Sequence, residues 1–319
     1  MIKLAIVSPC YNEEEVLPIS VKKLEALFKD LISRGKITKD SFVLFVNDGS
    51  KDSTWDLISS YHKSTDFING VNLTNNVGHQ NAIMAGMMTA YKLCDALITI
   101  DADIQDDLNC IEQMIDLCEQ GNDIVYGVKK SRTKDSFFKR TTAVTFYKVQ
   151  SAMGINAIYN HADFRLMKKE AVARLAKYNE KNLYLRGLMP EIGHKTATVD
   201  DTIQEREAGK SKYTLKKMLK LATDGIFSFS TKPISLIFGS SFLFFLIFLG
   251  IILYVCISLF TGNVVKGWTS IMASLWLIAS FIMLALGIIG EYVGKIYIEV
   301  KNRPLYHIEE VLIKENENE

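Results

Sequence analysis

Two long apolar stretches near the end of the chain constrain its fold more than any other feature. Residues 234–260 and 267–290 contain no carboxylate and no amine, and the segment between them reads TGNVVK. Each stretch is longer than the roughly 20 residues that a helix needs to cross a bilayer. Because so short a connection cannot hold a domain, the pattern predicts a two-helix transmembrane hairpin over residues 233–293, with both ends on the same side of the membrane.

Basic residues are concentrated on one side of this predicted hairpin. Lysines are frequent over residues 210–232, and Lys295 follows the second apolar stretch, whereas the connection contains Lys266 alone. By the positive-inside rule, this asymmetry places residues 1–213 and the C-terminal tail, residues 294–319, in the cytoplasm. The sequence therefore predicts a multi-pass protein of the cell (inner) membrane.

The segment that leads into the hairpin, residues 214–232, combines lysines with apolar residues at helical spacing. This pattern predicts an amphipathic juxtamembrane helix that lies among the lipid headgroups. A helix that packs on the protein is the alternative that the pattern leaves open. In either case the segment separates the membrane part from the domain formed by residues 1–213.

The charge balance and the cysteines exclude several classes of function. The chain has 37 basic and 36 acidic residues, so it lacks the basic excess that nucleic-acid binding requires. Its 5 cysteines are scattered without a Cys-x-x-Cys pair, which argues against a disulfide framework and against a zinc site. We interpret them as reduced thiols of a domain that faces the cytosol.

Strand-like and helix-like patterns alternate in the first part of the chain. The apolar runs KLAIVSP, SFVLFVN, INGVNLT and ALITI each end in polar turn residues, and helical patterns separate them. Buried parallel strands connected by helices indicate an α/β domain with a mostly parallel sheet. In such open sheets, ligands bind at the carboxyl ends of the strands. The turns over residues 9–13, 47–50 and 101–107 are therefore predicted to converge on one cleft.

The third of these turns, TIDADIQDD, is rich in carboxylates. Asp101, Asp103 and Gln105 alternate, so an extended backbone would direct their oxygens to one side. Hard oxygen donors without sulfur or imidazole suit Mg²⁺ or Mn²⁺, which bind through one or two carboxylates plus substrate phosphates. The segment thus predicts a divalent cation that carries a phosphate-bearing substrate. The alternative is that these carboxylates only start the next helix, and we accept that interpretation for Asp107.

A series of motifs resembles one known family. SPCYNEEEVLP, VNDGSKDST, NNVGHQNAIMAG, DADIQD, ADFRLM, LRGL and REAGKSKY occur in the order found in family 2 glycosyltransferases. The resemblance covers nearly the whole chain and is strongest to the membrane-anchored polyprenyl-phosphate glycosyltransferases, such as bacterial undecaprenyl-phosphate glucosyltransferases and dolichol-phosphate mannose synthases. It implies a GT-A-like catalytic domain over residues 1–213. The implied reaction is inverting transfer of a hexose, with glucose favoured, from a nucleotide sugar, with UDP favoured, to polyprenyl (undecaprenyl) phosphate.

The resemblance also implies which residues bind the donor. Asp48 would contact the base and Glu13 the ribose hydroxyls, although a turn-forming role for Asp48 and a helix N-terminal charge for Glu13 remain alternatives. A bound Mg²⁺ or Mn²⁺, held by Asp101, Asp103 and Gln105, would act as a Lewis acid on the leaving diphosphate. The complete nucleotide-sugar set is Pro9, Tyr11, Asn12, Glu13, Asp48, Asp101 and Ala102.

For the acceptor side, the resemblance implies a reaction centre and a set of basic residues. Asp163 and Arg165 of ADFRLM would lie at the reaction centre, with Asp163 either a base or a group that orients the sugar or the acceptor. A phosphate monoester is largely dianionic at neutral pH and scarcely needs a base. Cations must instead draw it toward the anionic donor, although a solvated charged face is the alternative for Lys129. The candidates are Lys129, Arg132, Arg140, Arg206 and Lys212.

Some residues depart from the family pattern, and other functions remain open. The usual DADLQDPP reads DADIQDDL, and Ile203 replaces a basic residue upstream of Arg206. A processive polysaccharide synthase is disfavoured because no Gln-x-x-Arg-Trp occurs, and a lipid transporter because its spans would lack polar residues. An inactive binding scaffold in the cell envelope is the alternative function from another class.

Two further features have more than one interpretation. Small residues in the apolar stretches would allow helices of two chains to pack closely, so a homo-oligomer remains open. His79 is either a polar cleft residue or a structural histidine.

Overall fold

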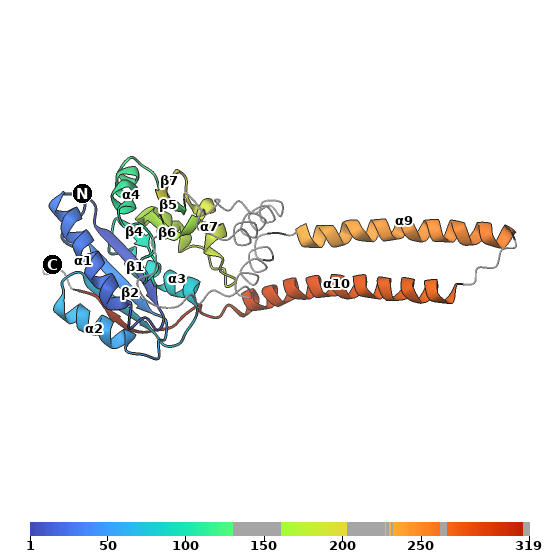
Figure 1. The fold of residues 1–319 in the computed structure, drawn as a ribbon, viewed down its shortest axis with the longest axis horizontal. Helices are drawn as coiled ribbons and strands as arrows, with labels where there is room; N and C mark the ends of the chain where they lie inside the picture. The colour runs from blue at the N-terminus through green and yellow to red at the C-terminus, as the bar shows by residue number, and fades with distance from the viewer. Residues whose placement is uncertain (130–160, 203–226, 228–229, 231, 262–266, 315–319) are drawn as a thin grey trace.

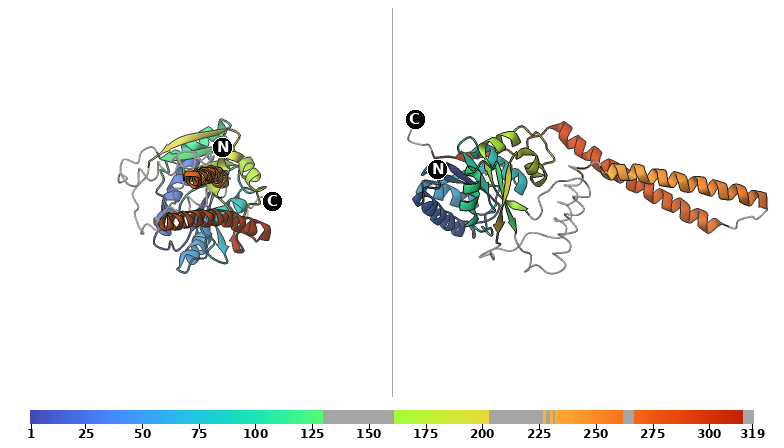
Figure 2. Two further views of the ribbon diagram at one scale, coloured as in Figure 1. Left: turned by 90° about the vertical axis from the view of Figure 1, so that its right-hand side faces the viewer. Right: turned by 90° about the horizontal axis from the view of Figure 1, so that it is seen from above.

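The computed structural model describes residues 1–129, 161–202, 227, 230, 232–261 and 267–314. Within these ranges the chain forms an 8-stranded sheet with helices on both faces. Two long helices leave this globular part at one end and extend away from it next to each other (Figure 1). Figure 2 shows the same arrangement from two further directions.

The sheet is mixed but mostly parallel in its centre. Strand order is β7-β5-β6-β4-β1-β2-β3-β8, and β1 pairs in parallel with both β2 and β4. Two strands run against their neighbours, since β6 is antiparallel to β4 and β5, and β8 is antiparallel to β3. The strands are β1 (Leu4–Cys10), β2 (Phe42–Asn47), β3 (Ile68–Leu73), β4 (Ala96–Thr99), β5 (Ile124–Lys129), β6 (His161–Lys168), β7 (Thr196–Asp201) and β8 (Ile308–Leu312).

Two apolar cores cover the two faces of the sheet. Side chains alternate along β1, so that Leu4 and Ile6 enter one core while Ala5 and Val7 enter the other. Because both faces are covered, β1 and β2 are buried along their whole length, which explains their continuous apolar sequences. One core packs on α1 (Leu17–Ser33), α2 (Thr54–Ser64) and α4 (Cys110–Glu119), and the other on α3 (His79–Ala90), α6 (Lys169–Leu175) and α7 (Leu185–Ile192). The predicted α/β layers are confirmed.

The two long helices correspond to the two apolar stretches of the sequence. They are α9 (Lys232–Thr261) and α10 (Trp268–Lys301). Within the described residues, one segment, Leu277–Lys301, has the length and apolar composition to cross a membrane. The two-helix transmembrane hairpin therefore stays a prediction. α10 also continues past residue 290, the expected end of the second apolar stretch, and so carries charged residues at its end near the sheet.

The C-terminal tail differs from the expectation of a separate segment. Residues 294–301 belong to α10, and Asn302, with φ of 46°, ends that helix. The chain then returns to the sheet, where β8 pairs with β3 and Tyr306 packs against the core shared by α3 and α7. The backbone N–H of Thr74 donates to the carbonyl of His307 at 3.1 Å, which closes this return. The long helix α10 is therefore fixed to the globular part at its C-terminal end. The predicted juxtamembrane helix over residues 214–232 lies largely outside the described residues.

Candidate functional site

The turns after β1 and β2 are joined by hydrogen bonds at the carboxyl edge of the sheet. The backbone N–H of Asn12 donates to Ser50 Oγ at 3.0 Å, and Asn12 Oδ1 accepts from the N–H of Lys51 at 2.8 Å. The N–H of Glu13 donates to Thr54 Oγ1 at 2.9 Å. These contacts bring the first two predicted turns together, as the parallel pairing of β1 with β2 requires.

Asp48 connects these turns to the loop before α3. Its side chain is 3% exposed, and its two carboxylate oxygens accept the backbone N–H groups of Val77 at 2.7 Å and Gly78 at 3.0 Å. Burial raises the pKa of this carboxyl, although both hydrogen bonds favour its ionised form. Asp48 therefore shapes the loop that leads to His79. This is the structural role that the sequence left open beside base recognition.

The acidic turn after β4 is not extended, contrary to the sequence argument. The N–H of Ile104 donates to the carbonyl of Asp101 at 3.1 Å, and Ile104 has a positive φ of 42°. The cause is the burial of Ala102 and Ile104, which enter the core beside α1, while Ser20 Oγ donates to the carbonyl of Ala102. Asp101 and Asp103 therefore project from a tight turn.

This turn fits a divalent cation that is shared with a substrate. The Asp101 side chain is 54% exposed. Within the described residues, no group of three or more His, Cys, Asp or Glu side chains is placed to hold a metal ion by itself. Mg²⁺ commonly takes one or two carboxylates and completes its shell with water and substrate phosphates. The donors Asp101, Asp103 and Gln105 match that chemistry because they supply oxygen alone.

Antiparallel pairing of β6 with β4 places Asp163 beside this turn. Thr99 is opposite Arg165, and Thr99 Oγ1 donates to the carbonyl of Asp163. His79, the first residue of α3, lies between the two acidic groups, with its Nε2 3.5 Å from Asp101 Oδ1 and 3.3 Å from Asp163 Oδ2. Residues from β4, β6 and α3 that are distant in the sequence thus form one cluster.

Two arginines complete the cluster around Asp163. Arg165 Nη2 lies 3.4 Å from Asp163 Oδ1, and Arg186 Nη2 lies 3.3 Å from Asp163 Oδ2. Burial opposes ionisation of Asp163, but the guanidinium of Arg186 and the hydrogen bond with His79 outweigh it and hold the pKa well below its usual range. For His79, burial lowers the pKa, but the hydrogen bond with Asp163 and the charge of Asp101 outweigh it and raise the pKa. Asp163 is therefore a weak base whose charge compensates cations.

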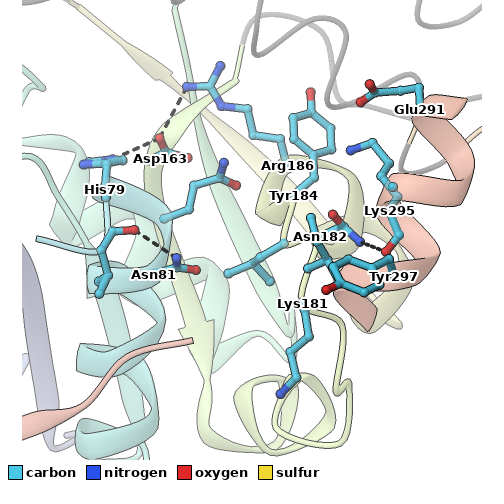
Figure 3. A pocket seen from close by; sticks show the side chains of 16 residues that line it. His79, Asn81, Asp163, Lys181, Asn182, Tyr184, Arg186, Glu291, Lys295 and Tyr297 are labelled. Atoms are coloured by element: carbon cyan, nitrogen blue, oxygen red, sulfur yellow. Dashed lines mark hydrogen bonds and ion pairs between the residues drawn. The ribbon is translucent and has the colours of Figure 1, made fainter. Parts of the chain in front are cut away.

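A pocket of about 870 Å³ opens beside this cluster. Its inner wall contains His79, Asp163 and Arg186, and its outer wall is the end of α10, which contributes Glu291 and Lys295 (Figure 3). The loop before α7 forms the third wall, with the buried Tyr184. The pocket thus lies between the reaction centre expected from the sequence and the end of α10, the helix that contains the candidate membrane span.

Several predicted residues are not part of this pocket. Lys129 ends β5 opposite Asp201 and does not line it. Arg132, Arg140, Arg206 and Lys212 lie outside the described residues. The expected nucleoside residues do not line the pocket either: Pro9 lies near the end of β1, and Tyr11, Asn12 and Glu13 lie on the turn after it. Their place at the carboxyl edge is the expected one, while their contacts with a nucleotide remain a prediction.

Sequence reasoning gave no role to Arg186 and interpreted Lys295 only as a flanking charge. Arg186 belongs to the LRGL motif, which was a signal of its importance. Glu291, Lys295 and Glu299 follow one another at intervals of four residues just after an apolar stretch. That spacing puts them on one face of a continuing helix, so it is the pattern that could have revealed a polar wall.

Comparisons with known proteins agree with these observations. Residues 5–176 match the family model described as glycosyl transferase family 2. The uncharacterized glycosyltransferase YkoT of Bacillus subtilis (strain 168) is 45% identical over 306 residues, which cover 96% of this chain and 91% of that protein. The SfII prophage-derived bactoprenol glucosyl transferase of Shigella flexneri is 35% identical over 308 residues, which cover 96% of this chain and 97% of that protein.

Among solved structures, the chain is similar to the mannosyltransferase PcManGT from Pyrobaculum calidifontis in complex with GDP-Man and Mn²⁺. The TM-score is 0.44 at 14% identity, and the match covers 94% of this chain and 87% of that chain. A likeness of this size carries no argument about the site.

Proposed function

Because this chain belongs to the polyprenyl-phosphate glycosyltransferases of glycosyl transferase family 2, we propose that it transfers a hexose from a nucleotide sugar to a polyprenyl phosphate. Glucose is the favoured sugar, since relatives that match over nearly the whole chain are named bactoprenol glucosyl transferases. UDP is the favoured nucleotide, and undecaprenyl phosphate the favoured lipid. The observation that carries the proposal is the cluster of His79, Asp101, Asp163 and Arg186 beside a pocket that α10 closes.

On the donor side, the turn after β1 binds the nucleoside in this proposal. Glu13 contacts the ribose hydroxyls. Asp48 contacts the base, since each of its carboxylate oxygens accepts one backbone N–H and can accept a second hydrogen bond. Pro9, Tyr11 and Asn12 complete the nucleoside side, and Asp101 and Ala102 lie at the diphosphate. The hydrogen bonds between the first two turns support this role because they fix the geometry of the nucleoside site.

At the diphosphate, Asp101, Asp103 and Gln105 would hold a divalent cation, Mg²⁺ or Mn²⁺. When bound, the cation supplies Lewis-acid stabilisation of the charge that develops on the leaving nucleoside diphosphate. The chain's own part is to direct oxygen donors from the turn that the burial of Ala102 and Ile104 imposes. The exposure of Asp101 supports this role, since a diphosphate can approach its carboxylate directly.

At the reaction centre, Asp163 orients cations and does not abstract a proton. Its contacts with His79, Arg165 and Arg186 keep it ionised and make it a weak base. The acceptor phosphate needs no base because it is already largely dianionic, so one of its oxygens attacks the anomeric carbon opposite the leaving diphosphate. The anomeric configuration is therefore inverted. Lys129, Arg132, Arg140, Arg206 and Lys212 remain candidates for contacts with the phosphates.

A lipid acceptor also accounts for the long helices. Leu277–Lys301 has the length and composition to cross a bilayer, and α9 runs next to it. In the proposal, both helices anchor the chain in the cell membrane as a hairpin, with the catalytic domain on the cytoplasmic side where nucleotide sugars are made. A polyprenyl phosphate in the same membrane then meets the site without leaving the bilayer surface.

The test uses the full chain, purified in detergent, with undecaprenyl phosphate, Mg²⁺ or Mn²⁺ and a panel of radiolabelled nucleotide sugars. Label from one donor should move into the organic phase, and EDTA should abolish the transfer. This result would identify the sugar and the nucleotide together. If no donor transfers label although one of them protects the protein against heating, the enzyme proposal is wrong and the inactive scaffold is favoured.

A further inference from the structure

The pocket against α10 has a chemistry that differs from that of the donor site. It combines the cationic groups of Arg186 and Lys295 with apolar side chains, among them Leu183 and Ile298, and its lining also contains the carboxylates of Asp163 and Glu291. In Figure 3 the side chain of Lys295 extends from α10 toward Tyr184, the guanidinium of Arg186 is directed toward Asp163, and the ammonium group of Lys181 points away from all three. A cavity with a cationic group on each of two facing walls and apolar side chains beside them fits a ligand that is both anionic and hydrocarbon-like.

We propose that this pocket binds the phosphate and the first isoprene units of the polyprenyl-phosphate acceptor, with Lys295 of α10 and Arg186 of α7 as the phosphate contacts. The inference rests on the proposed function and deepens it, because it assigns the acceptor subsite to residues of the membrane-directed helix. Neither residue was among the predicted phosphate-binding set.

The position of the pocket relative to the cluster supports this assignment. Asp163 and His79 form its inner wall, and His79 Nε2 lies 3.5 Å from Asp101 Oδ1 in the turn expected at the diphosphate. A phosphate in the pocket therefore lies beside the place where the donor's sugar must sit. The side chain of Arg186 is 25% exposed, so it can contact a ligand while its guanidinium pairs with Asp163 at 3.3 Å.

The outer wall connects the pocket to the membrane. Glu291, Gly294, Lys295, Tyr297 and Ile298 come from the part of α10 that continues the apolar segment. A lipid that lies along this helix in the bilayer reaches the pocket with its phosphate end first. The volume of about 870 Å³ accommodates a phosphate together with several isoprene carbons.

The nucleotide does not fit as the occupant of this pocket, because the residues expected to bind it lie elsewhere. Tyr11, Asn12 and Glu13 do not line the pocket. Asp48 does not line the pocket, but it accepts hydrogen bonds from the N–H groups of Val77 and Gly78, which do. The nucleoside site that includes Asp48 is therefore separated from the pocket by the loop of Val77 and Gly78. Donor and acceptor thus approach His79 from two sides.

The experiment compares Lys295→Gln with Lys301→Gln in the full-length chain. Lys301 is on the same helix and is exposed, and its ammonium lies 4.3 Å from the centre of the Tyr297 ring and outside the pocket lining. Lys295→Gln should raise the KM for undecaprenyl phosphate about tenfold or more, the size expected for one charge-assisted contact, and leave the KM for the nucleotide sugar unchanged. Lys301→Gln should change neither, and Lys295→Arg should restore acceptor binding.

A binding measurement separates failure of this inference from failure of the proposed function. Farnesyl phosphate, a short soluble polyprenyl phosphate, should bind the wild-type chain without any donor and should bind Lys295→Gln about tenfold more weakly. Inorganic phosphate at the same concentration should compete poorly, because it lacks the hydrocarbon. Binding without transfer by the wild type would refute the function but keep the subsite. Unchanged acceptor affinity in Lys295→Gln, or equal binding of inorganic phosphate, would overturn the subsite.

Discussion

Glu299 on α10 accepts two hydrogen bonds from Asn182, one from its backbone N–H and one from its side-chain amide, each at 2.8 Å. The N–H of Lys181 donates to the same carboxylate, and Asn182 Nδ2 also donates to the carbonyl of Lys295 at 3.1 Å. The loop that carries these donors leads into α7 and Arg186. The end of the membrane-directed helix therefore fixes one wall of the proposed acceptor pocket.

Replacing this carboxylate should weaken acceptor binding more than donor binding. Glu299→Ala leaves two backbone N–H groups without their acceptor and leaves the Asn182 amide with the Lys295 carbonyl alone, so the loop before α7 loses most of its hydrogen bonds to α10. We expect the KM for the lipid acceptor to rise several-fold with little change in the KM for the nucleotide sugar, measured by steady-state kinetics. Glu299→Gln should recover part of the effect because its amide oxygen still accepts.

The matched control for this variant is Glu310→Gln, on the exposed edge strand β8. It removes the same charge from the same end of the chain without touching the loop before α7. An equal rise in acceptor KM in both variants would mean that charge near the membrane, and not the attachment of the loop, is responsible.

Asp163 should be essential for both the stability and the activity of the site. Asp163→Asn keeps the size of the side chain but removes the carboxylate that pairs with the fully buried Arg165, and it takes one charged partner from His79 and one from Arg186. Breaking such a buried pair costs about 3–5 kcal/mol in the free energy of unfolding. Displacement of Arg186 should also lower the transfer rate by about 100-fold.

Urea unfolding and the transfer assay check this prediction together. Asp66→Asn, an exposed carboxylate between α2 and β3, is the control and should change neither quantity. A variant at Asp163 with wild-type stability and a wild-type rate would contradict the role that we assign to the cluster.

The acidic turn should determine how much metal the enzyme needs. Asp101→Asn removes an exposed carboxylate from the expected metal site, whereas Asp107→Asn changes a residue whose carboxylate accepts the N–H of Asn109, just before α4, at 3.0 Å. We expect the Mn²⁺ concentration for half-maximal activity to rise about tenfold or more for Asp101→Asn and to stay unchanged for Asp107→Asn. Electron paramagnetic resonance of Mn²⁺ in the presence of the nucleotide sugar gives a readout independent of turnover. Equal Mn²⁺ binding by both variants would argue against Asp101 as a ligand.

Gly49 should be far less tolerant of substitution than Gly35, although both have positive φ. A Cβ at Gly49 would lie 2.5 Å from the backbone nitrogen of Asn76, while a Cβ at Gly35 would meet nothing within 4 Å. Gly35→Ala should therefore cost only the strain of the left-handed conformation, about 1–2 kcal/mol. Gly49→Ala should cost about 1–3 kcal/mol more, because the loop that Asp48 holds must move. Urea unfolding of the two variants measures the difference in their free energies of unfolding. Equal stabilities would show that the loop at Asn76 can move away from the new Cβ at little cost.

The centre of the fold could be predicted from the sequence because its signals are local. Strands β1 and β2 are buried on both faces, so each appears as a continuous apolar run that ends in turn residues. Their parallel pairing then brings the turns at residues 9–13 and 47–50 together without further information. The mostly parallel α/β sheet was predicted for this reason.

Other parts depend on contacts that no local pattern reveals. Strand β8 reads IEEVL and lies at an edge with most of its side chains exposed, so it lacks the signature of a buried strand. The turn at residues 101–104 folds because Ala102 and Ile104 are buried, which an alternation of charges does not disclose. His79 and Arg186 meet Asp163 only through tertiary packing. The roles assigned to the individual site residues remain predictions.

The pairing of β8 with β3 has a consequence for the order of events during synthesis. This strand follows both long helices in the chain, so the edge of β3 stays uncovered until those helices have been made. A chain that stalls before β8 would expose an unpaired strand edge that quality-control proteases and aggregation can act on. Pairing of β8 with β3 thus reports that both long helices have been synthesised.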